Sequence, residues 1–352
     1  MGVSCGFTPT LQHIDYEQEK RQNDTTRVTL VYSPQINANY RHGKHALSLN
    51  YHASNLPPGL NLLFPVANND DPLTVREGNE HLKPSVNHGG RVAYNYDRWL
   101  DLSAGWSGTS NETGTATTYD PETGVRHVRD VNVNGSWTAN GSLRLSKYAD
   151  DFDYALSASY LHDRRPGFIE TAAASAPQKT VTRSHRFSLQ PSAGYARKGF
   201  EARLRPSWNY DVLESQGYEG RRMQRYMVDL DVAYTFDFGL GLYSSYDFNA
   251  YKGFNATEGK DKEHIWNLGV SFNTWKNRLT LKAEGYDVLG QQSGFSCLYY
   301  PNGTGKREAR NFAKASYVLF TVAYRFTTLK SRQTPSNGPA GFFSSPNVII
   351  VR

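Results

Sequence analysis

The chain has 352 residues, of which 38% are hydrophobic, 13% aromatic and 20% charged, and its formal net charge is +6. The aromatic content excludes a disordered chain, which would be poor in such residues. The sequence has no apolar run of about 18 residues and so excludes a transmembrane helix, but not a β-barrel, whose lipid-facing side chains occupy every second position. It also has no block of five like charges, so we expect no nucleic-acid partner.

Alternation of polar and apolar residues is the dominant pattern along the chain. In residues 226–238, the even positions from Tyr226 to Phe238 are apolar or aromatic, whereas Asp229, Asp231 and Asp237 lie at odd positions. A strand places these two sets on opposite faces, and a helix would mix them. The same alternation predicts fourteen strands, at 7–20, 26–41, 45–54, 89–97, 100–110, 125–147, 152–163, 182–197, 200–213, 222–238, 240–252, 263–275, 278–289 and 314–327.

The lengths of the connections alternate as well. Those after even-numbered strands are short, at 41–44, 97–99, 147–151, 197–199, 238–239 and 276–277. Those after odd-numbered strands are mostly long, at 55–88, 111–124, 164–181, 214–221, 253–262 and 290–313. Outer-membrane barrels have short periplasmic turns and long extracellular loops. The sequence therefore predicts an all-β fold, an antiparallel up-and-down transmembrane β-barrel.

One predicted strand contains two turn-forming dipeptides, Asn134-Gly135 and Asn140-Gly141, which favour two-residue hairpins. The apolar residues of this segment nevertheless keep to odd positions on both sides of the glycines, at Val131, Val133, Trp137, Ala139, Leu143 and Leu145. We therefore predict one continuous strand over 125–147.

The two faces have distinct roles in this prediction. Trp99 and Trp275 lie beside short turns, as expected of an interfacial aromatic girdle, although a soluble aromatic core is the alternative. The opposite face is expected to line a wet lumen with charges of both signs, at Glu201, Arg203, Arg205, Asp229, Asp231, Asp237, Lys282, Glu284 and Arg325.

No catalytic motif is present in the sequence, and its ten histidines occur singly, so we expect neither an enzyme, nor a cofactor, nor a metal site. The clustered oxygens of residues 68–71 would suit calcium, but the acidic tip of an exposed loop explains them as well and is favoured. Cys5 and Cys297 match no metal or redox spacing. Two unpaired cysteines are expected, and one disulfide remains an alternative.

The segment 55–96 contains "DPLTVREGNEHLKPSVNH", which resembles the "P-L-x-I-x-x-G-N-P-x-L-K-P-E" segment of TonB-dependent outer-membrane receptors. It is most similar to the outer-membrane β-barrel group common in Bacteroidetes-type bacteria. Glu80 and Ser85 depart from that pattern. The residues that match it are Pro72, Leu73, Gly78, Asn79, Leu82, Lys83 and Pro84.

The resemblance implies a domain organisation. Family members carry a signal peptide, a TonB box, a globular plug and a twenty-two-strand barrel. Residues 1–20 lack a basic start and an apolar stretch, so an exported protein is expected to begin further upstream. Residues 1–327 are accordingly expected to form the C-terminal part of such a barrel, without the plug, and residues 328–352 a low-complexity tail.

The resemblance also implies a function in the outer membrane of a Gram-negative bacterium. The chain would contact outer-membrane lipid and take up a large, scarce nutrient such as a siderophore, glycan, peptide or vitamin. TonB would act only through the plug, which this chain lacks. The alternative is a complete fourteen-strand barrel that serves as a passive pore or an adhesin, and an outer-membrane enzyme is the third candidate.

Overall fold

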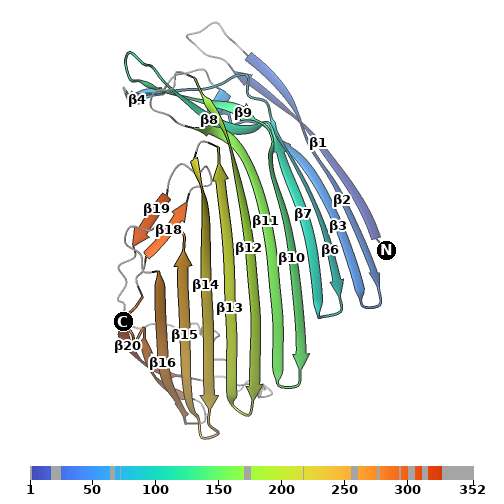
Figure 1. The fold of residues 1–352 in the computed structure, drawn as a ribbon. Coiled ribbons are helices and arrows are strands. Elements are labelled where there is room, and N and C mark those ends of the chain that lie inside the picture. Colours follow the sequence, from blue (N-terminus) through green and yellow to red (C-terminus); the bar gives the residue numbers. More distant parts are fainter. Residues whose placement is uncertain are drawn as a thin grey trace.

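The computed structural model describes residues 2–16, 25–63, 68–71, 73–169, 176–216, 218–254, 261–275, 278–292, 295–299, 306–310 and 316–326. Fourteen strands form one curved antiparallel sheet (Figure 1). In spatial order they are β1 (Gly2–Tyr16), β2 (Thr25–His42), β3 (His45–Leu56), β6 (Ser85–Tyr96), β7 (Leu100–Ser110), β10 (Ser136–Ala149), β11 (Phe152–Ile169), β12 (Gln178–Arg197), β13 (Phe200–Ser215), β14 (Tyr218–Thr235), β15 (Leu240–Lys252), β16 (Lys262–Thr274), β17 (Leu279–Tyr286) and β20 (Tyr317–Tyr324). The predicted up-and-down order of fourteen strands is confirmed.

The register between strands sorts the side chains as the alternation predicts. Between β13 and β14, Leu204 lies opposite Leu230, and Arg203 lies opposite Asp231. Leu230 is exposed, whereas Asp231 is buried. We call the side that carries Leu204 and Leu230 the apolar face and the side that carries Arg203 and Asp231 the polar face. In a membrane, the apolar face contacts lipid.

The polar face is the crowded side of the sheet. At five cross-strand pairs, a side chain of one strand lies over a glycine of the next, and a Cβ added to that glycine would lie within 2.8 Å of it. The side chain and glycine of each pair are Gln35 and Gly6, His52 and Gly89, Asn140 and Gly105, Asp153 and Gly194, and Tyr243 and Gly269. Such crowding is expected on the inside of a curved sheet.

Tight turns connect the strands at one end of the sheet. Lys198 and Gly199, between β12 and β13, both have positive φ, at 46° and 80°. Two consecutive positive φ values are typical of a type I′ turn, whose twist matches the twist of antiparallel strands. Trp99 and Trp275 lie at this end and are exposed, as predicted for a girdle. Residues 276–277 of the last predicted turn lie outside the described residues.

The other end of the sheet carries a second, four-stranded sheet, which we call the rim sheet (Figure 1). Its strands are β4 (Asn68–Asp71), β5 (Thr74–Glu77), β9 (Arg126–Val133) and β8 (Glu112–Tyr119), and β5 runs parallel to β9. The four-residue helix α1 (Leu60–Leu63) precedes it. The predicted long connections 55–88 and 111–124 therefore contain regular structure. A further hairpin, β18 (Phe295–Tyr299) and β19 (Lys306–Arg310), lies in the connection 290–313.

The prediction of one continuous strand over 125–147 is wrong. The chain bends at Gly135, which has a φ of 95°, so that β9 pairs within the rim sheet while β10 pairs within the large sheet. The side-chain oxygen of Asn134 accepts the backbone N–H of Asn111 at 2.6 Å and fixes the bend. The apolar residues did not reveal this break because those nearest to it keep to odd positions on both sides of the bend. The Asn134-Gly135 dipeptide was the signal that marked it.

Strands β1 and β20 form the two edges of the large sheet, and within the described ranges no hydrogen-bonded ladder joins them. The described part of the chain also contains no helix long and apolar enough to cross a membrane. The predicted tail 328–352 lies outside the described residues.

Candidate functional site

The motif segment lies in the rim sheet. Leu73 is exposed at the turn between β4 and β5, and its carbonyl oxygen accepts the backbone N–H of Arg126 at 2.9 Å. Gly78 follows β5, and Pro84 precedes β6. Pro72, the first residue of the motif, lies outside the described residues. The segment thus runs alongside β9 and then enters the large sheet.

Asn79 is the buried centre of this segment, with 8% of its surface exposed. Its side-chain amide donates to the carbonyl of Asp130 at 2.8 Å, and its side-chain oxygen accepts the backbone N–H of His81 at 3.1 Å. Nη2 of Arg129 also donates to that oxygen, at 3.4 Å. The backbone N–H of Asn79 donates to the carbonyl of Leu62 in α1 at 2.6 Å. This single residue therefore ties α1, the motif and β9 together.

Leu82 and Lys83 fix the remainder of the motif. Leu82 is fully buried. The backbone N–H of Lys83 donates to the side-chain oxygen of Asn132 at 2.7 Å, and the amide of Asn132 donates back to the carbonyl of Lys83 at 3.0 Å. The same amide reaches the carbonyl of Asn111 at 2.9 Å. The motif residues near β9 are therefore held by the side chain of Asn79, by the burial of Leu82 and by the backbone groups of Lys83, as expected of an architectural element.

A buried charge completes the rim sheet. The carboxylate of Asp130 is 7% exposed and accepts from Nη2 of Arg76 at 3.2 Å and from the hydroxyl of Thr115 at 2.8 Å. A buried carboxylate is strongly destabilising unless it is paired and hydrogen-bonded. The sequence predictions missed Asp130 and Asn132. Both lie at even positions, next to apolar residues at odd positions, and this could have indicated that they share a polar face.

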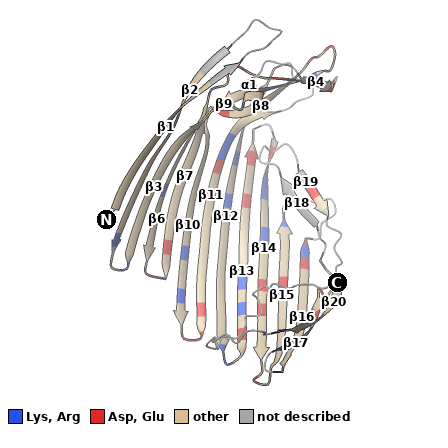
Figure 2. Ribbon diagram, turned by 180° about the vertical axis from the view of Figure 1, so that it is seen from behind, with Lys and Arg blue, Asp and Glu red and all other residues tan. Residues whose placement is uncertain are grey.

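The polar face of the large sheet carries a second set of charges. Arg205 of β13 forms an ion pair with Asp231 of β14 at 2.6 Å and lies 3.9 Å from Asp229. Figure 2 shows that positions of positive (blue) and negative (red) residues are intermingled along these strands. The predicted mixture of signs on this face is therefore present, and Arg205 lies near two of the predicted lumen residues.

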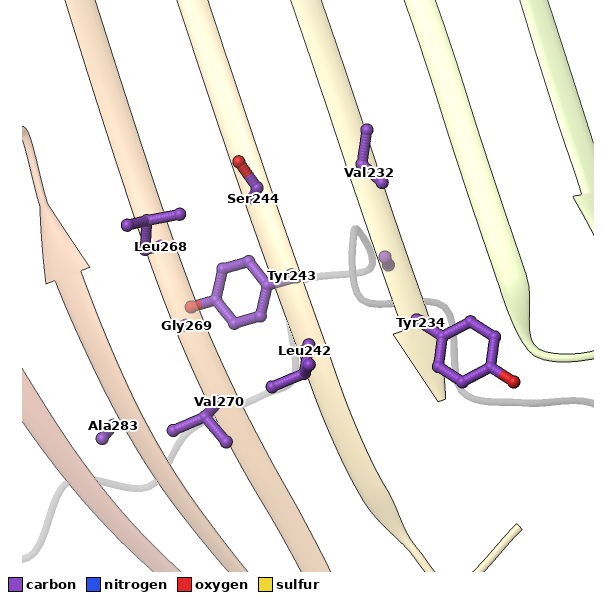
Figure 3. A pocket seen from close by; sticks show the side chains of 10 residues that line it. Val232, Tyr234, Leu242, Tyr243, Ser244, Leu268, Gly269, Val270 and Ala283 are labelled. Carbon is purple, nitrogen blue, oxygen red and sulfur yellow. The ribbon is translucent and has the colours of Figure 1, made fainter. Parts of the chain in front are cut away.

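Tyr243 shows how tightly the polar face is packed. Its ring lies over Gly269 on the neighbouring strand (Figure 3). Its hydroxyl donates to the carboxylate of Glu284. The hollow beside it is lined mainly by apolar-face residues of β14, β15 and β16, namely Val232, Tyr234, Leu242, Leu268 and Val270. The aliphatic and aromatic lining of this hollow on the apolar face suits contact with an acyl chain.

Residues 68–71 and the two cysteines were the remaining candidates for metal binding or disulfide formation. Within the described ranges, no group of three His, Cys, Asp or Glu side chains could hold a metal ion. In residues 68–71, which were considered for calcium, a carboxylate oxygen of Asp71 accepts the backbone N–H of Leu73 at 3.0 Å. Cys5 is a free, exposed thiol, as predicted, and the side chain of Cys297 lies outside the described ones.

Comparison with known proteins gives one family. Residues 10–239 match the model of the outer membrane protein beta-barrel family. The trimer form of OmpT, an outer membrane protein of Vibrio cholerae, is 12% identical, covers 92% of this chain and 99% of its own, and has a TM-score of 0.31. A Pseudomonas aeruginosa FadL homologue is 8% identical, covers 87% and 84%, and has a TM-score of 0.31. These TM-scores are too low to support an inference about this chain. No curated protein matches it.

Proposed function

Because this chain belongs to the outer membrane protein beta-barrel family and is therefore an outer-membrane protein, we propose that it is the barrel part of a TonB-dependent receptor. In this proposal it takes up a large, scarce nutrient, such as a siderophore, glycan, peptide or vitamin. The rim sheet faces the cell exterior, and the polar face lines the lumen. TonB acts through a plug that is not among residues 1–352. No cofactor, enzymatic activity or nucleic-acid partner is included.

The rim sheet is the observation that carries this proposal. Its strands are anchored by the buried groups of Asn79 and Asp130 rather than left as loose loops. A pre-formed surface at the mouth of a barrel lowers the entropic cost of binding a large ligand. A passive pore needs a polar lumen but has no need of such a surface.

The edges of the large sheet support a larger barrel. Within the described ranges, β1 and β20 are not paired with each other, although β1 is fifteen residues long. Unpaired backbone groups in hydrocarbon are each destabilising by several kcal/mol. Additional strands would satisfy them, as in the twenty-two-strand barrels implied by the resemblance of residues 72–84.

Uptake in cells tests the proposal. A strain that expresses the complete gene should accumulate a ferric siderophore, cobalamin or oligosaccharide from a defined panel, and TonB depletion should abolish that accumulation. The matched control expresses residues 1–352 alone and should show no TonB-dependent uptake. A steady, large conductance of the complete protein in planar bilayers, with uptake unaffected by TonB, would instead identify the passive pore.

A further inference from the structure

Two arginines face each other on the apolar face, close to the rim sheet. Arg164 of β11 and Arg183 of β12 are direct cross-strand partners. The next pair on the same face, one step toward the middle of the sheet, is His162 and His185. Figure 2 shows ribbon segments coloured blue for Lys and Arg near the rim-sheet ends of β11 and β12. Four basic side chains therefore lie together on two adjacent strands of the apolar face.

The histidines are already engaged in a fixed arrangement. Nδ1 of His185 lies 2.8 Å from the hydroxyl of Tyr160 and 3.1 Å from Nδ1 of His162. The indole ring of Trp137 lies 4.7 Å from the imidazole of His162, measured between ring centroids. Aromatic rings with polar tips are typical of the headgroup level of a membrane.

Similar pairs lie elsewhere on the apolar face. The hydroxyl of Tyr51 lies 3.0 Å from Nδ1 of His88, and that of Tyr246 lies 2.6 Å from Nδ1 of His264. Both share the Tyr–His arrangement. On the same face, however, the neighbouring cross-strand position next to each of them is not occupied by two arginines. The four basic side chains on β11 and β12 therefore distinguish this part of the sheet.

Like charges directly opposite each other on a sheet are destabilising. The guanidinium of Arg164 donates to the carbonyl of Gly135. Arg183 is exposed, and within the described ranges its side chain has no hydrogen bond or ion pair, although Glu214 is its cross-strand partner on β13. The guanidinium of Arg183 is therefore available to an external anion.

The position along the strand places this pair at the membrane surface. Arg164 lies twelve residues beyond Phe152, at which β11 begins next to the tight turn. At about 3.3 Å per residue and a tilt of about 40°, the guanidinium lies about 30 Å above that turn. The apolar band of an outer-membrane barrel is about 25 Å tall. Arg164 and Arg183 thus lie at the level of lipid headgroups.

We propose that Arg164 and Arg183, with Trp137 beside Arg164 and with His162 and His185 beneath them, bind the phosphate of an anionic lipid in the outer leaflet. Each guanidinium donates to the phosphate oxygens, which neutralises the like-charge pair. The acyl chains lie along the apolar residues of β11 and β12 below. The assignment to the outer leaflet rests on the proposed orientation of the rim sheet, whereas lipid binding itself does not depend on transport.

Native mass spectrometry of the protein extracted from outer membranes tests this site, with dioleoyl phosphatidic acid as the probe. R183Q should weaken binding several-fold, and R164Q/R183Q should weaken it roughly tenfold, because two charge-assisted hydrogen-bonding groups are lost. The matched control is K147Q, which removes an exposed cation from the apolar face at the opposite end of the sheet. It should change binding less than about twofold.

Three outcomes would overturn the proposal. One is an equal effect of R183Q and K147Q, since binding would then follow net charge alone. Another is full retention of phosphatidic acid by R164Q/R183Q. The third is displacement of the lipid by an equal concentration of inorganic phosphate, which would remove the membrane lipid as the occupant. Heat-modifiable migration on a gel verifies folding, and R183Q is the safer variant because Arg183 donates no internal bond in the described part of the chain. Uptake is not measured, so these outcomes are independent of the proposed transport function.

Discussion

Replacement of Asn79 by alanine should release the rim sheet without unfolding the large one. The side chain makes hydrogen bonds of 2.8 and 3.1 Å, to Asp130 and His81, and a longer one of 3.4 Å with Arg129. At about 1 kcal/mol for each neutral bond, and more for a buried group left without a partner, the loss is about 2–3 kcal/mol. The effect should be local because these partners all lie in the rim sheet or its motif segment.

Hydrogen exchange measures that loss directly. If β9 exchanges through opening of the rim sheet, its amides should exchange roughly 30- to 150-fold faster in N79A, while those of β13 and β14 stay unchanged. The matched control is N50A, on β3 of the large sheet, which should leave β9 unaffected. Unchanged exchange of β9 in N79A would refute the view that Asn79 anchors the rim sheet.

Three other perturbations probe the large sheet and the rim. L230R, on the apolar face, should destabilise the folded protein in lipid vesicles by about 2–4 kcal/mol if it lies near the midplane, whereas M227R, on the polar face of the same strand, should be much milder. Equal urea midpoints for the two variants would contradict the assignment of faces. G269A would place a Cβ 2.1 Å from the ring of Tyr243, so it should destabilise the sheet by about 1–3 kcal/mol, and Y243A should remove most of that effect. Additive effects in the double variant would argue against this contact. The backbone N–H of Glu122 and the hydroxyl of Thr123 hold the pKa of Asp120 below its ordinary 3.8. This stabilisation of the β8–β9 turn is therefore present above that pH and is lost as the pH falls through the lowered pKa. Proteolysis at residues 121–124 should rise with acidification in the wild type and be less pH-dependent in D120N, and the same profile in both would exclude Asp120.

The large sheet could be predicted because its chemistry repeats every second residue. In β14, apolar side chains at even positions and aspartates at 229 and 231 admit only one assignment of faces, and the register confirms it. The tight turns could be predicted as well, since Lys198-Gly199 and Gly239 separate two alternating segments. A local pattern was sufficient in each case.

The rim sheet could not be predicted in the same way. The residues of β8, ETGTATTY, are mostly small or polar on both faces, so they lack the alternation that identifies a strand. Its key contact joins Arg76 to Asp130 across 54 residues, and no local pattern specifies that pairing. The motif of residues 72–84 was found by resemblance, but its architectural role required the partners on β9.

Surface labelling in intact cells is the most direct test of an outer-membrane barrel whose rim sheet faces outward. In a C5S/C297S background, a cysteine is introduced at Glu122, in the exposed turn between β8 and β9, or at Lys198, in the tight turn between β12 and β13. A membrane-impermeant maleimide should label E122C in intact cells and K198C only after the outer membrane is permeabilised. Labelling of K198C but not E122C in intact cells would contradict the orientation, and labelling of both would contradict a membrane-spanning sheet.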